Sequence, residues 1–390
     1  MGKYIVMDVV FKASSLNYDQ GSGNYQELKK ITRWNGKQYT FVSRYALRYS
    51  LLETGKENGW IQIAKGENLQ LHGQAENKVI QPSSELLLSG GLLKYPEFDM
   101  FGYLITSTKP QNFREAPVKI SPAISMTPYN YDALFNANIG MANRMRKIKG
   151  DMSPNPFTSE EHETFYQYSI VIDVDSVGKL DLYLKKGEEV DFGEASEKWK
   201  LENAEPDKSD NTGKLKFTLK KNKKVKIIES DKEVKVEGNH ENEGIYHIVY
   251  SISDREEKIK NLIKCIMNLH RSIKGRDEDL SPKLLVLGFY ENKPYKTFKD
   301  RIELVDEISE ESIDEITETT EGSKKIVKVV HKTIKQTRPK FRIGGLDKNN
   351  NLKDENDVVT KVEEFLKGKN KSGVYLYKIP EIEVEKKTQN

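Results

Sequence analysis

The feature of this sequence that most constrains its fold is the order of its strand-like and helix-like segments. Five segments rich in β-branched and aromatic residues are predicted as strands: Tyr4–Phe11, Glu97–Thr106, Thr164–Val174, Gly244–Ile252 and Lys283–Tyr290. Two segments with apolar residues at helical spacing are predicted as helices: Ser43–Glu53, which Gly55 is expected to end, and Ser253–Ser272. Long polar stretches separate several of these elements.

When the polar stretches are treated as insertions, the order of elements predicts an α+β fold with a ferredoxin-like core. One insertion, Arg114–Ile148, holds several Pro and Asn residues and is expected to leave the core. A second, Lys179–Glu243, is rich in Lys, and residues 214–228 within it alternate well enough to form a hairpin.

The last ninety residues differ from the rest in their charge pattern. Glu303–Glu321 carries nine acidic residues, and Lys324–Arg342 carries eight Lys or Arg. Such charge blocks are typical of solvated surface or of a mobile segment. We therefore expect residues 301–390 to form a charged C-terminal extension, part of it mobile.

The composition limits the classes of protein to consider. Lys plus Arg number 63 and Asp plus Glu 60, so a nucleic-acid-binding protein with this balance must concentrate its positive charge locally. Cys265 is the single cysteine, which excludes a disulfide within the chain and a Cys-based zinc site. Asp8 interrupts the first apolar run too early for a signal peptide, and no run is long enough to span a membrane. We expect a cytoplasmic protein.

The first candidate binding segment extends from Asn17 to Arg48. Its Gly-rich loop would let the backbone approach phosphates, and Asn17 and Asn24 could donate hydrogen bonds to phosphate, sugar or base. Ser43 at the helix start, followed by Arg44 and Arg48 four residues apart, would favour an anion. On spacing alone, a polar loop followed by an ordinary amphipathic helix remains the stronger interpretation.

Two further basic segments have alternative interpretations. Lys119–Arg146, with Met126, Arg144 and several tyrosines, could stack on bases or pack a small satellite core, and the pattern favours neither. Lys220–Lys226 suits phosphate attraction, but a solvated hairpin tip is the more common structure for such a run.

Catalytic and metal-binding motifs are missing from the sequence. The six histidines are scattered, without the spacing of helix-borne metal ligands, and no phosphate-loop or nucleophile-elbow motif occurs. His270, placed near the end of the second predicted helix, is the best candidate for a nuclease acid or base, although a basic helix end explains it more simply. We expect no enzyme activity, no metal and no cofactor.

Five segments in this order resemble a known family: Ser15–Tyr25, Ser43–Leu51, Phe98–Leu104, Pro117–Ser125 and Asn138–Arg144. The set is similar to the DevR-type CRISPR-associated autoregulators, the Cas-seven backbone subunits of type I-B Cascade. The resemblance covers most of residues 1–290. It implies a modified RNA-recognition fold shaped like a hand, and copies that stack into a helical filament along the CRISPR RNA beside other Cascade subunits. The guide bases would stay free to pair with target DNA.

Carried onto this chain, the resemblance implies a division into palm, fingers and thumb. The palm would comprise residues 1–51 and 156–300, and the fingers residues 52–155 with a palm strand near 97–106. The thumb would be either the Lys-rich insertion 179–243 or part of the tail after Arg301. The implied RNA contacts are Asn17, Asn24, Ser43, Arg44, Arg48, Met126, Asn143 and Arg144. Two alternatives stay open: a CRISPR-RNA-processing endoribonuclease using His270, and a regulator that binds duplex DNA.

Overall fold

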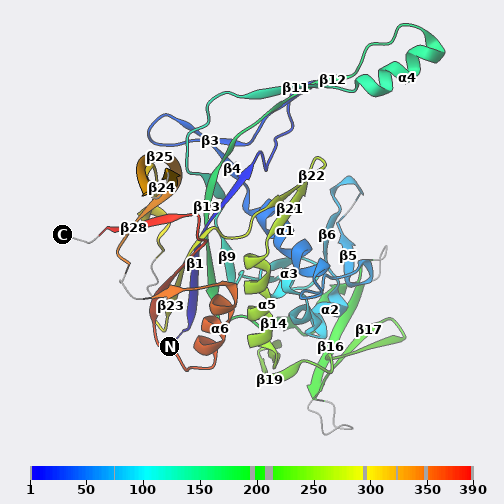
Figure 1. Ribbon diagram of the computed structural model, residues 1–390. Coiled ribbons are helices and arrows are strands. Elements are labelled where there is room, and N and C mark those ends of the chain that lie inside the picture. The colour runs from blue at the N-terminus through cyan, green and yellow to red at the C-terminus, as the bar shows by residue number, and fades with distance from the viewer. Residues whose placement is uncertain are drawn as a thin grey trace.

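The computed structural model describes most of the chain (Figure 1). Its described residues are 2–73, 75–193, 198–206, 214–292, 297–321, 324–346 and 350–387; side chains are left out of the description at 75, 306–321, 324–338, 386 and 387. Together these residues form a mixed α+β structure with several separate sheets.

The centre of the molecule is a nine-stranded sheet. In spatial order its strands are β26 (Asn351–Leu352), β27 (Gly373–Lys378), β23 (Leu284–Tyr290), β1 (Tyr4–Ser14), β13 (Glu163–Asp173), β10 (Ala123–Ser125), β4 (Gln38–Val42) and β3 (Lys30–Thr32), while β9 (Val118–Ile120) also pairs with β13. Neighbours from β27 to β3 are antiparallel. The strands expected over 4–11, 164–174 and 283–290 are confirmed as β1, β13 and β23.

Three helices cover one face of this sheet: α1 (Arg44–Glu57), α5 (Arg255–Met267) and α6 (Glu355–Leu366) (Figure 1). Their apolar faces bury Leu47, Leu51, Leu262, Ile263, Val358 and Phe365 against alternate residues of β1, namely Ile5, Met7, Val9 and Phe11. Alternate residues of a strand point to the same face, so these four side chains meet the helices together, and burying each one contributes roughly 2 kcal/mol.

Gly55 does not end α1, contrary to the expectation from sequence. The helix continues to Glu57, and Gly55 is buried inside it. A Cβ on Gly55 would lie 2.6 Å from Cδ1 of Ile61 and 2.8 Å from Sγ of Cys265, which belongs to α5. Glycine is therefore present because α1 and α5 pack closely at this point.

The C-terminal residues are not a separate charged extension, so that prediction is wrong for the described residues 350–387. β27 and β26 extend the large sheet, and α6 packs against α5. The ring of Phe365 stacks on Phe289 of β23, with 4.6 Å between ring centroids. The sequence expectation followed the charge blocks and overlooked the apolar spacing of Val358, Val362 and Phe365 further along the chain.

The strand expected over 97–106 is also wrong. α3 (Pro96–Asp99) occupies its first half, Gly102 then adopts a φ of 77°, and only β7 (Tyr103–Ile105) is extended. β7 pairs with β8 (Asn112–Arg114) outside the large sheet. β9 and β10 pair with β13 in the large sheet instead. Both strands belong to the segment 114–148, which was expected to leave the core. Pro122, which has no backbone N–H, separates these two short strands.

A second lobe has a core of its own. Its elements are β5 (Leu69–His72), β6 (Val79–Pro82), α2 (Ser84–Leu88), β14 (Lys179–Lys185), β15 (Glu189–Asp191), β16 (Lys198–Pro206), β17 (Leu215–Lys221), β18 (Lys224–Glu229), β19 (Lys235–Asn242) and β20 (Ile245–Ser251). The core includes Leu87, Leu182, Trp199, Phe217 and Tyr250. The hairpin predicted over 214–228 is confirmed as β17 and β18. The strand predicted over 244–252 is present as β20, but it lies in this lobe and not in the large sheet.

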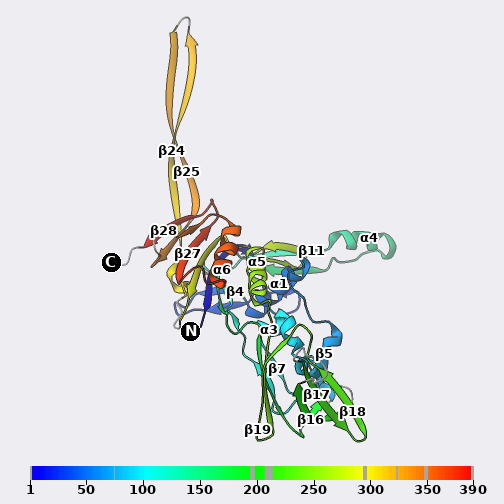
Figure 2. The ribbon, with the colours of Figure 1, turned by 90° about the horizontal axis from the view of Figure 1, so that it is seen from below.

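Two structures project from the body. The first, which we call the arm, consists of β11 (Ala133–Ala137), α4 (Ile139–Lys149) and β12 (Pro156–Glu160), with α4 at its far end (Figure 1). The second is the long antiparallel hairpin of β24 (Ile302–Glu321) and β25 (Lys324–Gly344), whose base pairs with β28 (Glu383–Lys387) (Figure 2). The acidic and basic blocks of the tail thus pair in register along their backbones.

The base of the long hairpin covers the face of the large sheet opposite the helices. Phe341 of β25 meets Phe165 of β13 edge to face, with 5.2 Å between ring centroids. Asp8, the acidic residue within the apolar β1, is buried on this face. Its carboxylate accepts hydrogen bonds from Oγ of Ser169 and from the backbone amide of Phe298, which explains how a buried strand tolerates it.

Candidate nucleic-acid interface

The start of α1 is held by the loop that precedes it. Oγ of Ser43 accepts a hydrogen bond from the amide of Ala46 at 3.2 Å, and the amide of Ser43 donates to Oδ1 of Asn17 at 3.0 Å. The carbonyl of Asn17 accepts from the amide of Lys29. No acidic residue lies in the first turn of α1, so this helix end keeps its positive character.

Arg44 and Arg48 follow on the same side of α1. The exposed Arg44 donates to the hydroxyl of Tyr45 at 2.7 Å, and that contact lowers the pKa of Tyr45. The half-buried guanidinium of Arg48 lies 5.5 Å from the ring centroid of Phe101. Burial lowers the pKa of Arg48, but arginine starts from so high a value that it stays charged at neutral pH. Both arginines therefore present positive charge beside aromatic rings.

A hollow of about 370 Å³ lies beside these arginines. Its lining comes from α1, from the turn after α3, and from β9 with the segment leading into it: Arg44, Tyr45, Arg48, Phe101, Glu115, Ala116, Val118, Lys119 and Ile120. Sequence reasoning missed Tyr45, Phe101 and Lys119 as members of this site. Tyr45 and Tyr49, four residues apart and both exposed, were a signal in the sequence that could have indicated it.

The hairpin formed by β21 (His270–Ile273) and β22 (Arg276–Asp279) contacts α1 and the loop before it. α5 ends at Met267, so His270 and Arg271 lie on a strand and not at a helix end, as had been expected. Arg271 donates to the carbonyls of Leu16 and Ala46 and to Oγ of Ser50. It thereby ties the Asn17 loop to α1.

His270, the nuclease candidate, contacts the other end of α1. Its Nε2 lies 2.8 Å from a carboxylate oxygen of Glu57, and its Nδ1 lies 3.4 Å from Oγ1 of Thr54. Both ring nitrogens therefore have partners on this helix.

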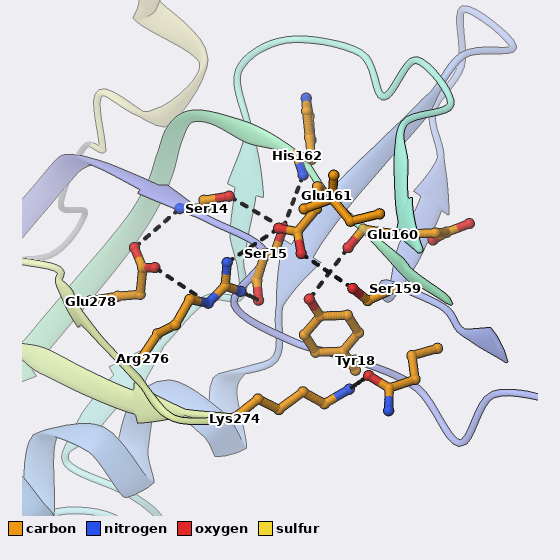
Figure 3. A network of polar contacts seen from close by, with 12 residues as sticks. Ser14, Ser15, Tyr18, Ser159, Glu160, Glu161, His162, Lys274, Arg276 and Glu278 are labelled. Carbon is orange, nitrogen blue, oxygen red and sulfur yellow. Dashed lines mark hydrogen bonds and ion pairs between the residues drawn. The ribbon is translucent and has the colours of Figure 1, made fainter. Parts of the chain in front are cut away.

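A polar network joins the loop after β1, which includes Asn17, to the end of the arm that lies next to the large sheet (Figure 3). Glu161 accepts from Oγ of Ser15 at 2.6 Å and from Arg276 at 3.2 Å. Lys274 donates to Gln26 and lies 3.5 Å from the ring centroid of Tyr18. The cations of this hairpin therefore hold protein groups in place.

Glu160 is the buried centre of the arm's attachment. Its carboxylate accepts from Nζ of Lys30 at 2.6 and 2.7 Å, from the hydroxyl of Tyr25 at 3.0 Å and from the amide of Leu28 at 2.8 Å. The side chain of Glu160 is only 4% exposed and that of Lys30 16%. The loop 17–30 and the arm are thus fixed to each other by a buried ion pair.

The remaining residues expected to bind RNA do not join the α1 cluster. Asn24 is exposed, and its carbonyl accepts from Thr158 of the arm. Met126 packs at the edge of the core that lies beneath the long hairpin. Asn143 and Arg144 are exposed on α4. The structure therefore brings Asn17, Ser43, Arg44 and Arg48 together and distributes the other four over three places.

The arm exposes an unusual number of large apolar side chains. They are Leu134, Phe135, Ile139, Met141, Met145, Ile148, Met152 and Phe157. Ala142 is the one residue of α4 that is buried, while Arg144, Arg146, Lys147 and Lys149 add positive charge. A concentration of exposed apolar side chains of this kind is typical of an interaction site.

Other sites are missing from the part of the chain that the structure describes. No group of three or more His, Cys, Asp or Glu side chains is arranged to hold a metal ion. Among the same residues, no helix has both the length and the apolar character needed to cross a membrane.

Solved structures give weak overall likenesses. A chain of a "CRISPR RNA-guided surveillance complex, pre-nicking" is 10% identical, with 75% of this chain and 80% of that chain covered and a TM-score of 0.38. A chain of a "Type IV-B CRISPR Complex" is 12% identical, with 44% and 73% covered and a TM-score of 0.28.

Sequence comparison is more specific. "CRISPR-associated protein Cas7/Cst2/DevR" of Myxococcus xanthus (strain DK1622) is 28% identical over 171 residues, which are 38% of this chain and 50% of that protein. The chain thus spans about half the length of this curated relative. The family described as "CRISPR-associated negative auto-regulator DevR/Csa2" matches residues 5–313. Because that match covers most of the sequence, the chain belongs to the DevR/Csa2 family of CRISPR-associated proteins.

Proposed function

We propose that this protein is a non-catalytic RNA-binding backbone subunit of a type I-B Cascade-like surveillance complex. Several copies would line up along one CRISPR RNA beside other Cascade subunits and leave the guide bases free to pair with target DNA in antiviral defence. The observation that carries the proposal is the cluster of Asn17, Ser43, Arg44 and Arg48 at the start of α1. A helix N-terminus with two adjacent guanidinium groups is suited to the sugar–phosphate backbone.

A ferredoxin-like palm is supported by the order of strands in the large sheet. β23, β1, β13 and β10 are neighbours in that order, α1 lies between β1 and β9 in the sequence, and α5 lies between β13 and β23. This is the arrangement of a β-α-β-β-α-β unit. The palm proposed here consists of these strands and helices, so its second strand is β9 with β10 and not the segment 97–106.

We assign the thumb to the arm, in place of either segment considered from sequence. The Lys-rich insertion 179–243 is built into the second lobe around Leu182 and Phe217, with residues of the fingers insertion. The arm leaves the large sheet between β10 and β13 and carries exposed apolar and basic side chains, Arg144 among them. Apolar wedges with flanking cations are suited to interrupting base stacking and to contacting a neighbouring copy.

A binding experiment with the full-length protein tests the proposal. Single-stranded RNA should bind more tightly than duplex DNA of equal length, and the double variant Arg44→Glu, Arg48→Glu should weaken RNA binding at least tenfold. Each lost phosphate contact should lower the salt slope by about 0.7 for a single strand. Lys56→Glu provides the control, because Lys56 is exposed at the other end of α1 and does not line the hollow.

The family description as a negative auto-regulator favours one second candidate, a protein that binds duplex DNA. The same experiment separates the two functions. Tighter binding to duplex DNA than to RNA, lost in the double arginine variant, would support the regulator and overturn the proposed RNA-binding role.

A further inference from the structure

The hollow beside α1 combines an apolar floor with aromatic walls. Val118 is 2% exposed and lies in the main core, and Phe101 and Ile120 are half-buried. Tyr45 forms one wall with its side chain 64% exposed. A flat apolar group that enters the hollow would therefore meet aromatic faces without displacing any part of the core.

Cations lie against both aromatic rings of the hollow. The guanidinium carbon of Arg44 is 4.8 Å from the ring centroid of Tyr45, and that of Arg48 is 5.5 Å from the ring centroid of Phe101. An arginine and an aromatic ring presented together are the pair on which unpaired nucleobases stack. The two arginines would at the same time reach the phosphates that flank such a base.

The charges that line the hollow favour an anionic ligand. Glu115, the single acidic residue of the lining, is paired with Lys119 at 2.5 Å, so Arg44 and Arg48 supply the excess positive charge. An apolar side chain from a protein partner would suit the floor but would bring no anion to the two arginines at its rim. A nucleotide suits both parts of the hollow, because its base can contact the apolar floor and its phosphate can bind the arginines.

We propose that the hollow lined by Tyr45, Phe101, Arg44 and Arg48 receives one unstacked base of the bound RNA strand. The base stacks on Tyr45, and the arginines hold the adjacent phosphates. This inference rests on the proposed RNA-binding function and adds to it a base-binding site, so the base in the hollow would not pair with target DNA while the other bases stay free. Every base has a π-face, so the site should accept all four bases with weak preference.

Photocrosslinking locates the base directly. Synthetic single-stranded RNAs, each carrying 4-thiouridine at one position, would be bound to the full-length protein, irradiated and mapped by mass spectrometry. At least one position should crosslink within the peptide Tyr45–Arg48 or at Phe101. Tyr45→Ala should abolish that crosslink and weaken RNA binding about tenfold, as expected for the loss of one stacked base. Tyr45→Phe should preserve both.

Tyr49 provides the matched control. It lies one turn further along α1, is 62% exposed and does not line the hollow. Tyr49→Ala should leave crosslink and affinity unchanged. Wild-type RNA binding without any crosslink at Tyr45 or Phe101, or an equal loss in both alanine variants, would overturn the base site while leaving RNA binding intact. A wild-type protein that binds no RNA would overturn the proposed function as well.

Discussion

The backbone amide of Ser43 donates a hydrogen bond to Oδ1 of Asn17 across 3.0 Å. This one contact joins the Gly-rich loop to the start of α1, and Ser43 in turn caps the helix through Ala46. Loop and helix therefore present their polar groups as a single surface. Asn17 accepts this bond through its side-chain oxygen, while its side-chain amide donates to the carbonyl of Tyr18 at 3.3 Å.

Substitutions of Asn17 should separate stability from RNA binding. Asn17→Ala leaves the Ser43 amide without its acceptor and should lower the free energy of unfolding by about 1 kcal/mol. Asn17→Asp keeps an acceptor and should remain close to wild type in urea unfolding, yet bind RNA more weakly because its charge repels phosphate. Equal RNA binding by Asn17→Asp and wild type would contradict a place for Asn17 at the interface.

The ion pair of Glu160 and Lys30 should stabilise the attachment of the arm. Glu160→Gln leaves the half-buried Lys30 without its anion and should lower the free energy of unfolding by about 3 kcal/mol in urea titration. Lys12 and Glu163 form a matched exposed pair at 2.5 Å, with side chains 51% and 63% exposed. Glu163→Gln should therefore cost less than about 1 kcal/mol. Equal costs at the two sites would refute the role of burial.

His162 should make stability depend on pH. Burial lowers its pKa below the ordinary value of 6.5, so the unfolded chain binds more protons than the folded one just below that value. The free energy of unfolding should thus fall as pH decreases from 6.5 towards the folded-state pKa. His162→Gln should flatten this decline in urea titrations at stepwise pH. An unchanged slope in His162→Gln would rule out this cause.

Arg144 tests the arm independently of α1. Arg144→Glu should weaken RNA binding and the formation of multi-copy assemblies, measured by light scattering, without changing the thermal midpoint, because α4 buries only Ala142. Lys224→Glu serves as the control, because it reverses the charge of an exposed residue in the β17–β18 hairpin. If both variants assemble like wild type, the arm is not the thumb.

Much of the central sheet could be predicted because β1, β13 and β23 contain nearly continuous runs of β-branched, aromatic and other apolar residues, which are visible locally. β9 and β10 escaped prediction because Pro122 divides them into strands of three residues, too short to show a period. The core role of α6 was hidden by the charge blocks before it. In the site, the spacing of Arg44 and Arg48 made them candidates, and the family resemblance of the surrounding segments, not the spacing, favoured them. Phe101 and Lys119 were not, because only the folding of distant segments brings them beside this helix.

The most direct test of the central claim is whether RNA co-purifies with the protein when it is expressed with its neighbouring subunits. The account predicts a short RNA of defined length in the wild-type preparation and in Lys56→Glu, and its loss in Arg44→Glu, Arg48→Glu at an unchanged thermal midpoint. The same amount of RNA in all three preparations, or none in the wild type, would contradict it.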